Sequence, residues 1–373
     1  MKINLFLLQK MWQKRQMSKL VLWASAFIWV NLGMIQMATA VPSYYNITDL
    51  GTLSGPYSSA AQDINEAGQV VGWSQTMMNG YVSATHAFLW QKGSMTDIGA
   101  FSAISPRGEA FGINEVGQVV GWSETDQGKR AFIWDSSTGI MIPIAPLQGG
   151  TWSQASDINN QGQVIGGAGI PFSDEHAFLW DAVNGMQYLN MGQAHAINNQ
   201  SQVVGNDLWE NGSITTLGFQ PYMAYGINNL PSVQVVGRSG ADNTQHAFLW
   251  QNNSMQDLGT LGGSMSEAWA INDFSQVVGR ADINGSSHAF LWQNGTMYDL
   301  NDWLMPGSIG EVKVAYDINN SGQIVGQGYF NGQEHAFLLT PVPEPASLLL
   351  LGSGCLGLIG LGLRRKRRCS KVS

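Results

Sequence analysis

One unit occurs seven times along this chain, and this repetition limits the possible folds more than any other feature of the sequence. Each copy contains the element Ala-x-x-Ile-Asn, and copies follow one another about every 42 residues. The isoleucines of the seven copies are Ile64, Ile113, Ile158, Ile197, Ile227, Ile271 and Ile318. A period of this length is typical of propeller blades. We therefore interpret the region as one repeat domain, although about 300 residues would by themselves suggest two domains.

The rest of each unit consists of short segments that are rich in β-branched and aromatic residues. After Ala-x-x-Ile-Asn come Gln-Val-Val-Gly, His-Ala-Phe-Leu-Trp and Met-x-Asp-Leu-Gly, separated by turns such as 159–163 that contain Asn and Gly. Asn and Gly tolerate the positive φ of tight hairpins, and the segments between them are typical of strands. The unit is therefore predicted to be a four-stranded antiparallel meander in an all-β protein.

The two ends of the repeat region complement each other. The seventh unit runs from His335 into Pro341 without a fourth strand, whereas residues 45–51 near the N-terminus match the fourth strand at 254–259. The first strand can thus complete the last blade and remove two open sheet edges. We predict a seven-bladed β-propeller over residues 41–341, closed by this N-terminal strand, with Ala-x-x-Ile-Asn innermost and its small alanines at the crowded axis.

Residues 1–40 are predicted to be a signal peptide. Basic residues precede an apolar run over 20–37, and Ala38-Thr39-Ala40 provides the small side chains that signal peptidase requires at its cleavage site. An uncleaved N-terminal anchor is the alternative.

Residues 342–373 carry a second targeting pattern. Pro343-Glu344-Pro345 precedes an apolar run over 348–363, which as a helix would span about 24 Å and form a short transmembrane segment. A basic cluster follows it: Arg364, Arg365, Lys366, Arg367 and Arg368. This cluster would stay in the cytoplasm and leave the repeats outside. The tail resembles the PEP-CTERM sorting signal. That resemblance implies processing by an exosortase-type peptidase in a Gram-negative bacterium that makes an extracellular polysaccharide matrix, or biofilm.

The charge of the repeat region excludes one class of partner. Residues 41–343 contain 7 basic and 25 acidic side chains, a formal charge of −18. Nucleic acid binding needs cations to neutralise phosphates, so we expect no nucleic acid partner. Both cysteines, Cys355 and Cys369, lie in the tail, so the repeats have neither a disulfide nor a thiol nucleophile.

The third segment of the unit carries a further resemblance. His-Ala-Phe-Leu-Trp stands at 86–90, 176–180, 246–250 and 288–292, with Arg130-Ala131-Phe132-Ile133-Trp134 as a variant. It resembles the HAF-repeat extracellular proteins, which are exported repeat proteins without an established activity. The resemblance therefore implies location and shape but no chemistry.

We expect no metal and no cofactor in this domain. Symmetry spreads the repeated histidines around the ring, whereas a metal needs its ligands together. Asp63, Asp157 and Asp317 precede Ile-Asn on innermost strands and could hold Ca²⁺ in the channel, which remains the alternative, although the sequence lacks a calcium-binding loop.

Candidate binding residues are found where the repeats differ. The variable position of the innermost strand is occupied by Gln62, Phe111, Ser156, His195, Tyr225, Trp269 and Tyr316, and Glu109 and Glu267 precede the repeat alanine in two units. Aromatic rings and carboxylates at a channel mouth suit carbohydrate, unless the aromatic residues fill the blade core instead. We predict a non-enzymatic module that binds polysaccharide or envelope components. Alternatives are a polysaccharide hydrolase or lyase that uses Glu109 and Glu267, and a purely structural spacer.

Overall fold

The computed structural model describes residues 44–343 except 79–80, 103–105, 147–148, 170–175, 219–221 and 241–243. Tyr44–Pro343 form one compact unit. The predicted signal peptide and the apolar run of the tail lie outside the described residues.

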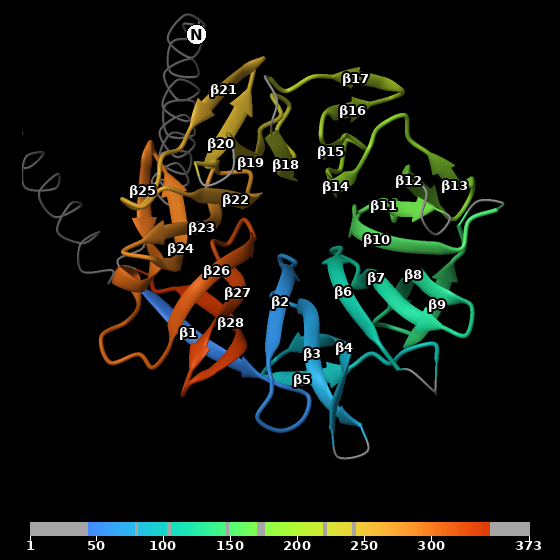
Figure 1. Cartoon of the computed structure of the whole chain (residues 1–373), viewed down its shortest axis with the longest axis horizontal. Coiled ribbons are helices and arrows are strands. Elements are labelled where there is room, and N and C mark those ends of the chain that lie inside the picture. The colour runs from blue at the N-terminus through green and yellow to red at the C-terminus, as the bar shows by residue number, and fades with distance from the viewer. Residues whose placement is uncertain are drawn as a thin grey trace, which may run out of the picture. The chain divides into compact units, whose positions relative to one another are not determined.

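Seven four-stranded antiparallel sheets stand around a common axis as the blades of a propeller (Figure 1), as the repeat predicted. The innermost strands are β2 (Ser59–Ile64), β6 (Gly108–Ile113), β10 (Trp152–Ile158), β14 (Ala194–Ile197), β18 (Tyr222–Ile227), β22 (Ser266–Ile271) and β26 (Glu311–Ile318). The second strands are β3 (Val70–Met78), β7 (Gln118–Thr125), β11 (Val164–Gly169), β15 (Val203–Gly205), β19 (Val235–Ser239), β23 (Val277–Ile283) and β27 (Ile324–Phe330).

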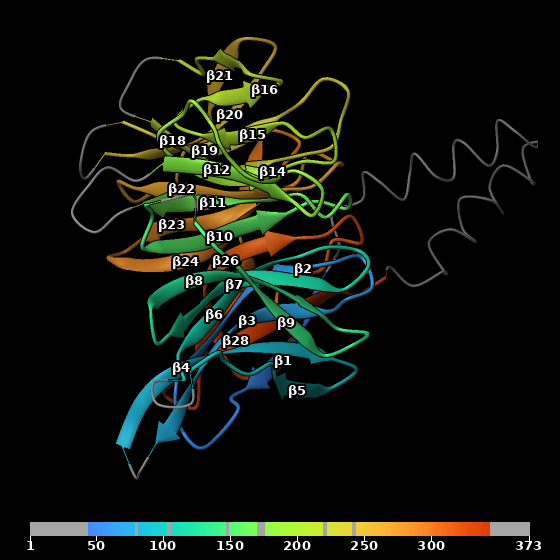
Figure 2. The same ribbon diagram turned by 90° about the vertical axis from the view of Figure 1, so that its right-hand side faces the viewer.

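The outer half of each blade is equally regular. The third strands are β4 (Tyr81–Gln91), β8 (Gly128–Asp135), β12 (His176–Asp181), β16 (Leu208–Glu210), β20 (His246–Gln251), β24 (Ser286–Gln293) and β28 (Gln333–Pro341). The outermost strands are β5 (Ser94–Asp97), β9 (Ile140–Ile144), β13 (Gly185–Tyr188), β17 (Ser213–Thr215), β21 (Ser254–Asp257), β25 (Thr296–Asp299) and β1 (Tyr45–Gly51), and a 3₁₀ turn, η1 (Leu300–Trp303), follows β25. Figure 2 shows the blades from the side, with the β3–β4 hairpin reaching beyond its neighbours.

The N-terminal strand closes the ring, as predicted. Strand β1 pairs antiparallel with β28, with Tyr45 opposite Pro341, and so becomes the outermost strand of the last blade. Just outside the ladder, Val342 donates its backbone N–H to the carbonyl of Tyr44 at 2.9 Å. On the same two strands, the His335 Nδ1 lies 2.9 Å from a carboxylate oxygen of Asp49. The first and last strands of the propeller are therefore held together by both backbone and side-chain contacts.

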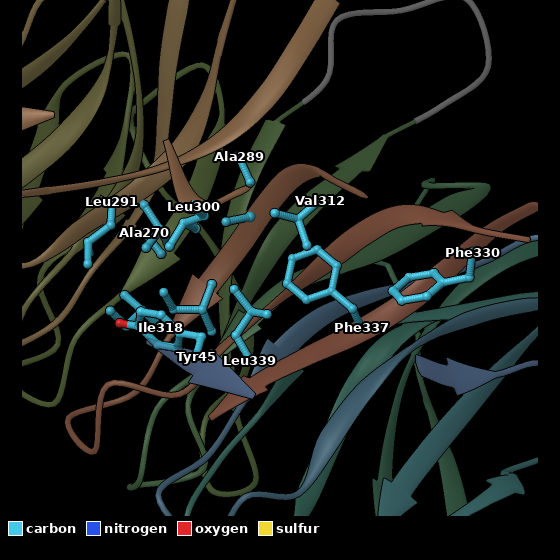
Figure 3. Packing of buried hydrophobic residues seen from close by; sticks show 13 residues of the cluster. Tyr45, Ala270, Ala289, Leu291, Leu300, Val312, Ile318, Phe330, Phe337 and Leu339 are labelled. Carbon is cyan, nitrogen blue, oxygen red and sulfur yellow. The ribbon is translucent and has the colours of Figure 1, made fainter. Parts of the chain in front are cut away.

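The hydrophobic core is divided into seven clusters, each shared by two adjacent blades. The cluster between the sixth and seventh blades brings Leu291 of β24 and Leu300 of η1 against Phe337 and Leu339 of β28 (Figure 3). Tyr45 of β1 is fully buried in the same cluster. Because each sheet is covered on both faces, its strands can carry consecutive apolar residues such as Val-Val and Phe-Leu.

The repeat alanines do not line the axis as expected, because they are buried in these clusters. Directly opposite each alanine lies the glycine of Gln-Val-Val-Gly, for example Gly72 opposite Ala61. A Cβ on Gly72, Gly121 or Gly166 would lie 1.9–2.0 Å from a carbonyl oxygen of the innermost strand. The innermost and second strands therefore approach so closely that only glycine fits.

A closed ring of asparagine side chains joins the blades at the end of the innermost strands. Each Asn Nδ2 donates to the backbone carbonyl of the corresponding asparagine in the next blade, at 3.0–3.4 Å, and the seventh donates to the first. The ring consists of Asn65, Asn114, Asn159, Asn198, Asn228, Asn272 and Asn319, all at most 5 % exposed. Each asparagine is held in place by the glutamine of its own Gln-Val-Val-Gly segment, as Asn114 is by Gln118. We refer to these seven residues as the Asn ring.

The residues that follow the Asn ring form a second circuit. Each accepts, through its side-chain oxygen, the backbone N–H of the same position in the preceding blade, and the circuit closes from Asn320 to Glu66. Its members are Glu66, Glu115, Asn160, Asn199, Asn229, Asp273 and Asn320. All seven carry an acceptor oxygen, which explains why only Asn, Asp and Glu occupy this position.

Substituting one member of the Asn ring should weaken the whole propeller. We expect Asn114→Ala to lower the free energy of unfolding by about 2–4 kcal/mol, because buried backbone groups of two blades lose their partners. The exposed Asn46 of β1 provides the control, since Asn46→Ala should change it by less than about 0.5 kcal/mol. Chemical denaturation measures both values, and equal effects would show that the ring does not stabilise the fold.

Removing the closing strand should have a larger effect. We expect residues 53–343 to unfold at least about 10 °C below residues 41–343, because β28 loses its partner and the contacts of Tyr45 and Leu50 are lost. Calorimetry of the two chains provides the comparison. Identical melting temperatures would mean that the closure contributes nothing to stability.

Candidate functional site

The variable residue of each innermost strand is a β-bulge. In all seven strands the register with the second strand shifts at this position, so one residue is skipped by the ladder. The skipped residues are Gln62, Phe111, Ser156, His195, Tyr225, Trp269 and Tyr316, and all are partly exposed. A bulge redirects its side chain away from the regular alternation of the strand. The aromatic residues therefore do not fill the blade core, which was the alternative prediction.

Four of the bulged residues form a continuous row across four consecutive blades. The rings of Tyr225 and Trp269 are stacked, with centroids 4.4 Å apart and planes at 28°. His195 packs edge-on against Tyr225 at 5.3 Å, and Tyr316 packs edge-on against Trp269 at 5.8 Å. We call these four residues the aromatic wall. Burial lowers the pKa of His195, so its ring is neutral at pH 7.

Two polar atoms of the aromatic wall have no hydrogen-bond partner. Among the residues that the structure describes, neither the Nε2 of His195 nor the Nε1 of Trp269 is bonded, and both atoms are shielded from solvent. Buried polar atoms normally have partners, so each such atom calls for an explanation. A ligand or ordered water that offers an oxygen to Trp269 Nε1 would satisfy it.

Glu267 lies beside the aromatic wall as part of an ion-pair group. Its side chain is 2 % exposed and accepts from Arg238 Nη1 at 2.5 Å and from Arg280 Nε at 2.8 Å. Arg238 also lies near the Tyr225 ring, 5.8 Å from its centroid. A buried carboxylate needs such partners, because leaving it unpaired is costly. Both oxygens of Glu267 are thus engaged in structural contacts.

Glu109 is separate from this group. It lies in the second blade, on β6, where Trp122 Nε1 and Thr85 Oγ1 each approach its carboxylate at 3.4 Å. Glu267 lies on β22 of the sixth blade. Strands β6 and β22 are not adjacent, because β6 lies between β2 and β10, and β22 lies between β18 and β26. The structure therefore gathers five of the six candidate residues around the fourth to seventh blades and leaves Glu109 apart.

The repeated histidines pair with the repeated aspartates inside their own blades. His86, His246 and His288 place Nδ1 2.6–2.9 Å from the carboxylates of Asp97, Asp257 and Asp299. Each aspartate also accepts a backbone N–H two residues further on. Asp97 and His86 line a pocket of about 310 Å³, but their pairing recurs in other blades and belongs to the repeat.

The channel aspartates bridge neighbouring blades through the backbone. Asp157 accepts the N–H of Ile158 at 2.7 Å and that of Ile197 in the next blade at 2.9 Å. Asp63 likewise accepts from Ile64 and Ile113, and it shares a side-chain hydrogen bond with Asp317. No group of three or more His, Cys, Asp or Glu side chains within the described ranges could hold a metal ion.

Burial raises the pKa of each of these aspartates, that of Asp157 to about 8. The negative charge of Asp63 raises the pKa of Asp157 further. These carboxyl groups therefore take up protons at a higher pH in the folded protein than in the unfolded chain.

Comparisons with known proteins identify the tail. A model of the PEP-CTERM protein-sorting motif matches residues 341–368, and a model described as a protein of unknown function (DUF3466) matches residues 54–147. The sorting motif marks the chain as an exported protein of the cell envelope or surface that is processed by an exosortase during export. Neither model is the HAF-repeat family, and no curated protein matches the chain.

Solved structures match the propeller. The oligogalacturonate lyase of Vibrio parahaemolyticus has a TM-score of 0.53 at 10 % identity, covering 80 % of this chain and 94 % of that chain. The β-propeller domain of the Trilobed protease from Pyrococcus furiosus has a TM-score of 0.51 at 9 % identity, with the same coverages of 80 % and 94 %. At such identities the likeness extends to the fold alone. In the part of the chain that the structure describes, no helix has the length and apolar character needed to cross a membrane.

Sequence reasoning missed Arg238 and Arg280. Both lie in second strands, directly after the glycine of Val-Val-Gly, where other repeats carry residues such as Trp73 and Gln327. Only the pairing of the second strand with the innermost strand brings these two arginines beside the bulged positions.

The raised pKa of Asp157 predicts a pH-dependent stability. Between the ordinary Asp pKa near 3.9 and about 8, the folded protein binds more protons than the unfolded chain, so the free energy of unfolding should fall as the pH rises. We expect melting temperatures to decline from pH 5 to pH 8, and to decline less in Asp157→Asn. As the control, Asp181→Asn should keep the wild-type slope, since turn hydrogen bonds lower the pKa of Asp181. An unchanged slope in Asp157→Asn would refute the assignment.

Proposed function

We propose that this chain is an exported cell-surface or extracellular-matrix protein whose propeller binds polysaccharide without catalysing its turnover. The aromatic wall is the observation that carries this proposal. Its rings lie at bulged positions of four consecutive blades and are partly exposed. The fold itself needs no aromatic side chain there, because the first and third blades carry Gln62 and Ser156.

The chemistry of the wall suits a sugar. A pyranose presents apolar C–H faces that pack on aromatic rings, and hydroxyl groups that need nearby hydrogen-bond donors and acceptors. The Nε1 of Trp269 and the Nε2 of His195 lie within the wall as polar atoms that have no partner among the described residues and are shielded from solvent. A row that extends over four blades offers more than one ring to a chain-like ligand.

The sorting tail supports a location in which polysaccharide is the surrounding material. We further propose, from the resemblance to PEP-CTERM and HAF-repeat proteins, that the chain is an exported repeat protein of a Gram-negative bacterium that makes such a matrix. The location and the ligand are separate parts of the proposal, and a binding measurement tests the second.

The geometry gives the enzymatic alternative no specific support. A hydrolase that works with two carboxyl groups needs them about 5–9.5 Å apart. Glu109 and Glu267 lie in blades two and six, and the oxygens of Glu267 are bonded to two arginines. Binding without turnover is therefore the function that we favour.

Replacing the central ring of the wall should abolish most of the binding. On a glycan array, we expect Trp269→Ala to weaken binding of the preferred ligand at least about tenfold, since one stacking platform is lost. Tyr188→Ala serves as the matched aromatic control, because Tyr188 is 42 % exposed on β13, the outermost strand of the third blade. Equal binding by both variants, or binding of no glycan by the wild type, would contradict the proposal.

A further inference from the structure

We propose that the glycan bound at the aromatic wall carries carboxylate groups, as uronic acids do, and that Arg238 and Arg280 recognise them. This inference rests on the proposed polysaccharide binding and adds the chemical class of the sugar. Four observations support it: the position of the arginines in the repeat, their charge balance, their free donors and their neighbours.

The two arginines are departures from the repeat. The residue after the conserved glycine of the second strand is tryptophan in the first and second blades and glycine in the third, but arginine in the fifth and sixth. Tyr225 and Trp269, the stacked pair of the aromatic wall, belong to the same two blades. The two blades that carry an arginine at this position therefore also carry the stacked aromatic pair.

The fold does not require two arginines at this point. Glu109 is the counterpart of Glu267 in the second blade, and there the indole Nε1 of Trp122 faces the carboxylate from the opposite strand. In the sixth blade Arg280 faces Glu267 in the same register. A neutral donor is thus compatible with a glutamate at this position.

The group has a surplus of positive charge. Two guanidinium groups surround one carboxylate, which leaves a formal charge of +1 on a domain whose overall charge is −18. Glu267 is buried, whereas the side chains of Arg238 and Arg280 are 30 % and 41 % exposed. The positive charge therefore faces the solvent and the negative charge does not. An acidic polymer is repelled elsewhere on this surface and attracted here.

Donors remain available for a ligand. Arg280 uses Nε for Glu267 at 2.8 Å, and its two Nη groups have no partner among the described residues. Arg238 binds Glu267 through Nη1 and Met223 Sδ through Nη2 at 3.7 Å, and its guanidinium lies 5.8 Å from the centre of the Tyr225 ring. The forked edge of a guanidinium matches the two oxygens of a carboxylate. A sugar ring on the stacked pair would have its carboxylate beside these donors.

The test compares two probes that differ only in whether each sugar carries a carboxylate or a neutral hydroxymethyl group. Binding of a uronic-acid oligosaccharide and of its carboxyl-reduced, neutral counterpart to the exported mature protein is measured by calorimetry. We expect the wild type to prefer the acidic probe, and Arg280→Gln to weaken that binding at least about tenfold. Arg280→Lys keeps the positive charge but not the forked donors, so its affinity for the acidic probe should lie between those of the wild type and Arg280→Gln.

Lys92→Gln is the matched control. Lys92 is exposed and lies in the β4–β5 turn of the first blade, whereas Arg238 and Arg280 belong to the fifth and sixth blades. Like Arg280→Gln, the control removes one positive charge. It should leave both affinities within about twofold of the wild type, since the Debye length at physiological salt is only about 8 Å. An equal loss in Lys92→Gln and Arg280→Gln would overturn the assignment. Melting temperatures of both variants verify that they are folded.

The remaining outcomes separate the two proposals. In one, the wild type binds both probes equally, and this binding is lost in Trp269→Ala and kept in Arg280→Gln. That result would support polysaccharide binding and refute the recognition of carboxylates. Binding of neither probe, nor of any glycan on the array, would refute both.

Discussion

The hydrogen bonds of the Asn ring are the constraint on which the rest of this structure depends. A closed ring of seven blades needs the same contact between every pair of neighbours. The side-chain amide that donates to the backbone of the next blade provides it, from the first blade to the bond that joins the seventh back to the first. The bond satisfies buried polar groups on both sides of every blade interface, where water has no access. The hydrophobic clusters between the blades can then be dry, with fully buried phenylalanines such as Phe88 and Phe178.

Three residues before the Asn ring in each innermost strand, the bulge separates the residues that stabilise the fold from the residue that is free to bind a ligand. The alanine before it packs against glycine in the blade core, and the isoleucine after it returns to the core, but the bulged residue belongs to neither pattern. Different side chains occupy this position, and blade four carries His195 and blade one carries Gln62 with the same ladder on either side. The protein therefore has seven positions around its axis at which specificity can vary while the repeat is preserved.

The fold was largely predictable from the sequence, whereas the site was only partly so. Strand segments, blade number and closure follow from local patterns and a fixed period, which long-range packing does not override. The Asn ring was invisible, because Asn114 and its equivalents resemble ordinary turn residues until the next blade is in place. The alanines were assigned to the axis because regular alternation hides a one-residue bulge. The bulged aromatic residues were identified, but the approach of Arg238 to Tyr225 and the pairing of Arg280 with Glu267 arise only from strand pairing.

The pairing of the first strand with the last also sets the order of events during export. Strand β1 leaves the membrane first and has no partner until β28, the final strand before the sorting motif, has followed it. Until then the seventh blade lacks its outermost strand, and the closure that joins the last blade to the first is incomplete. The ring can therefore be completed only after the strand that adjoins the sorting motif is available to pair with β1.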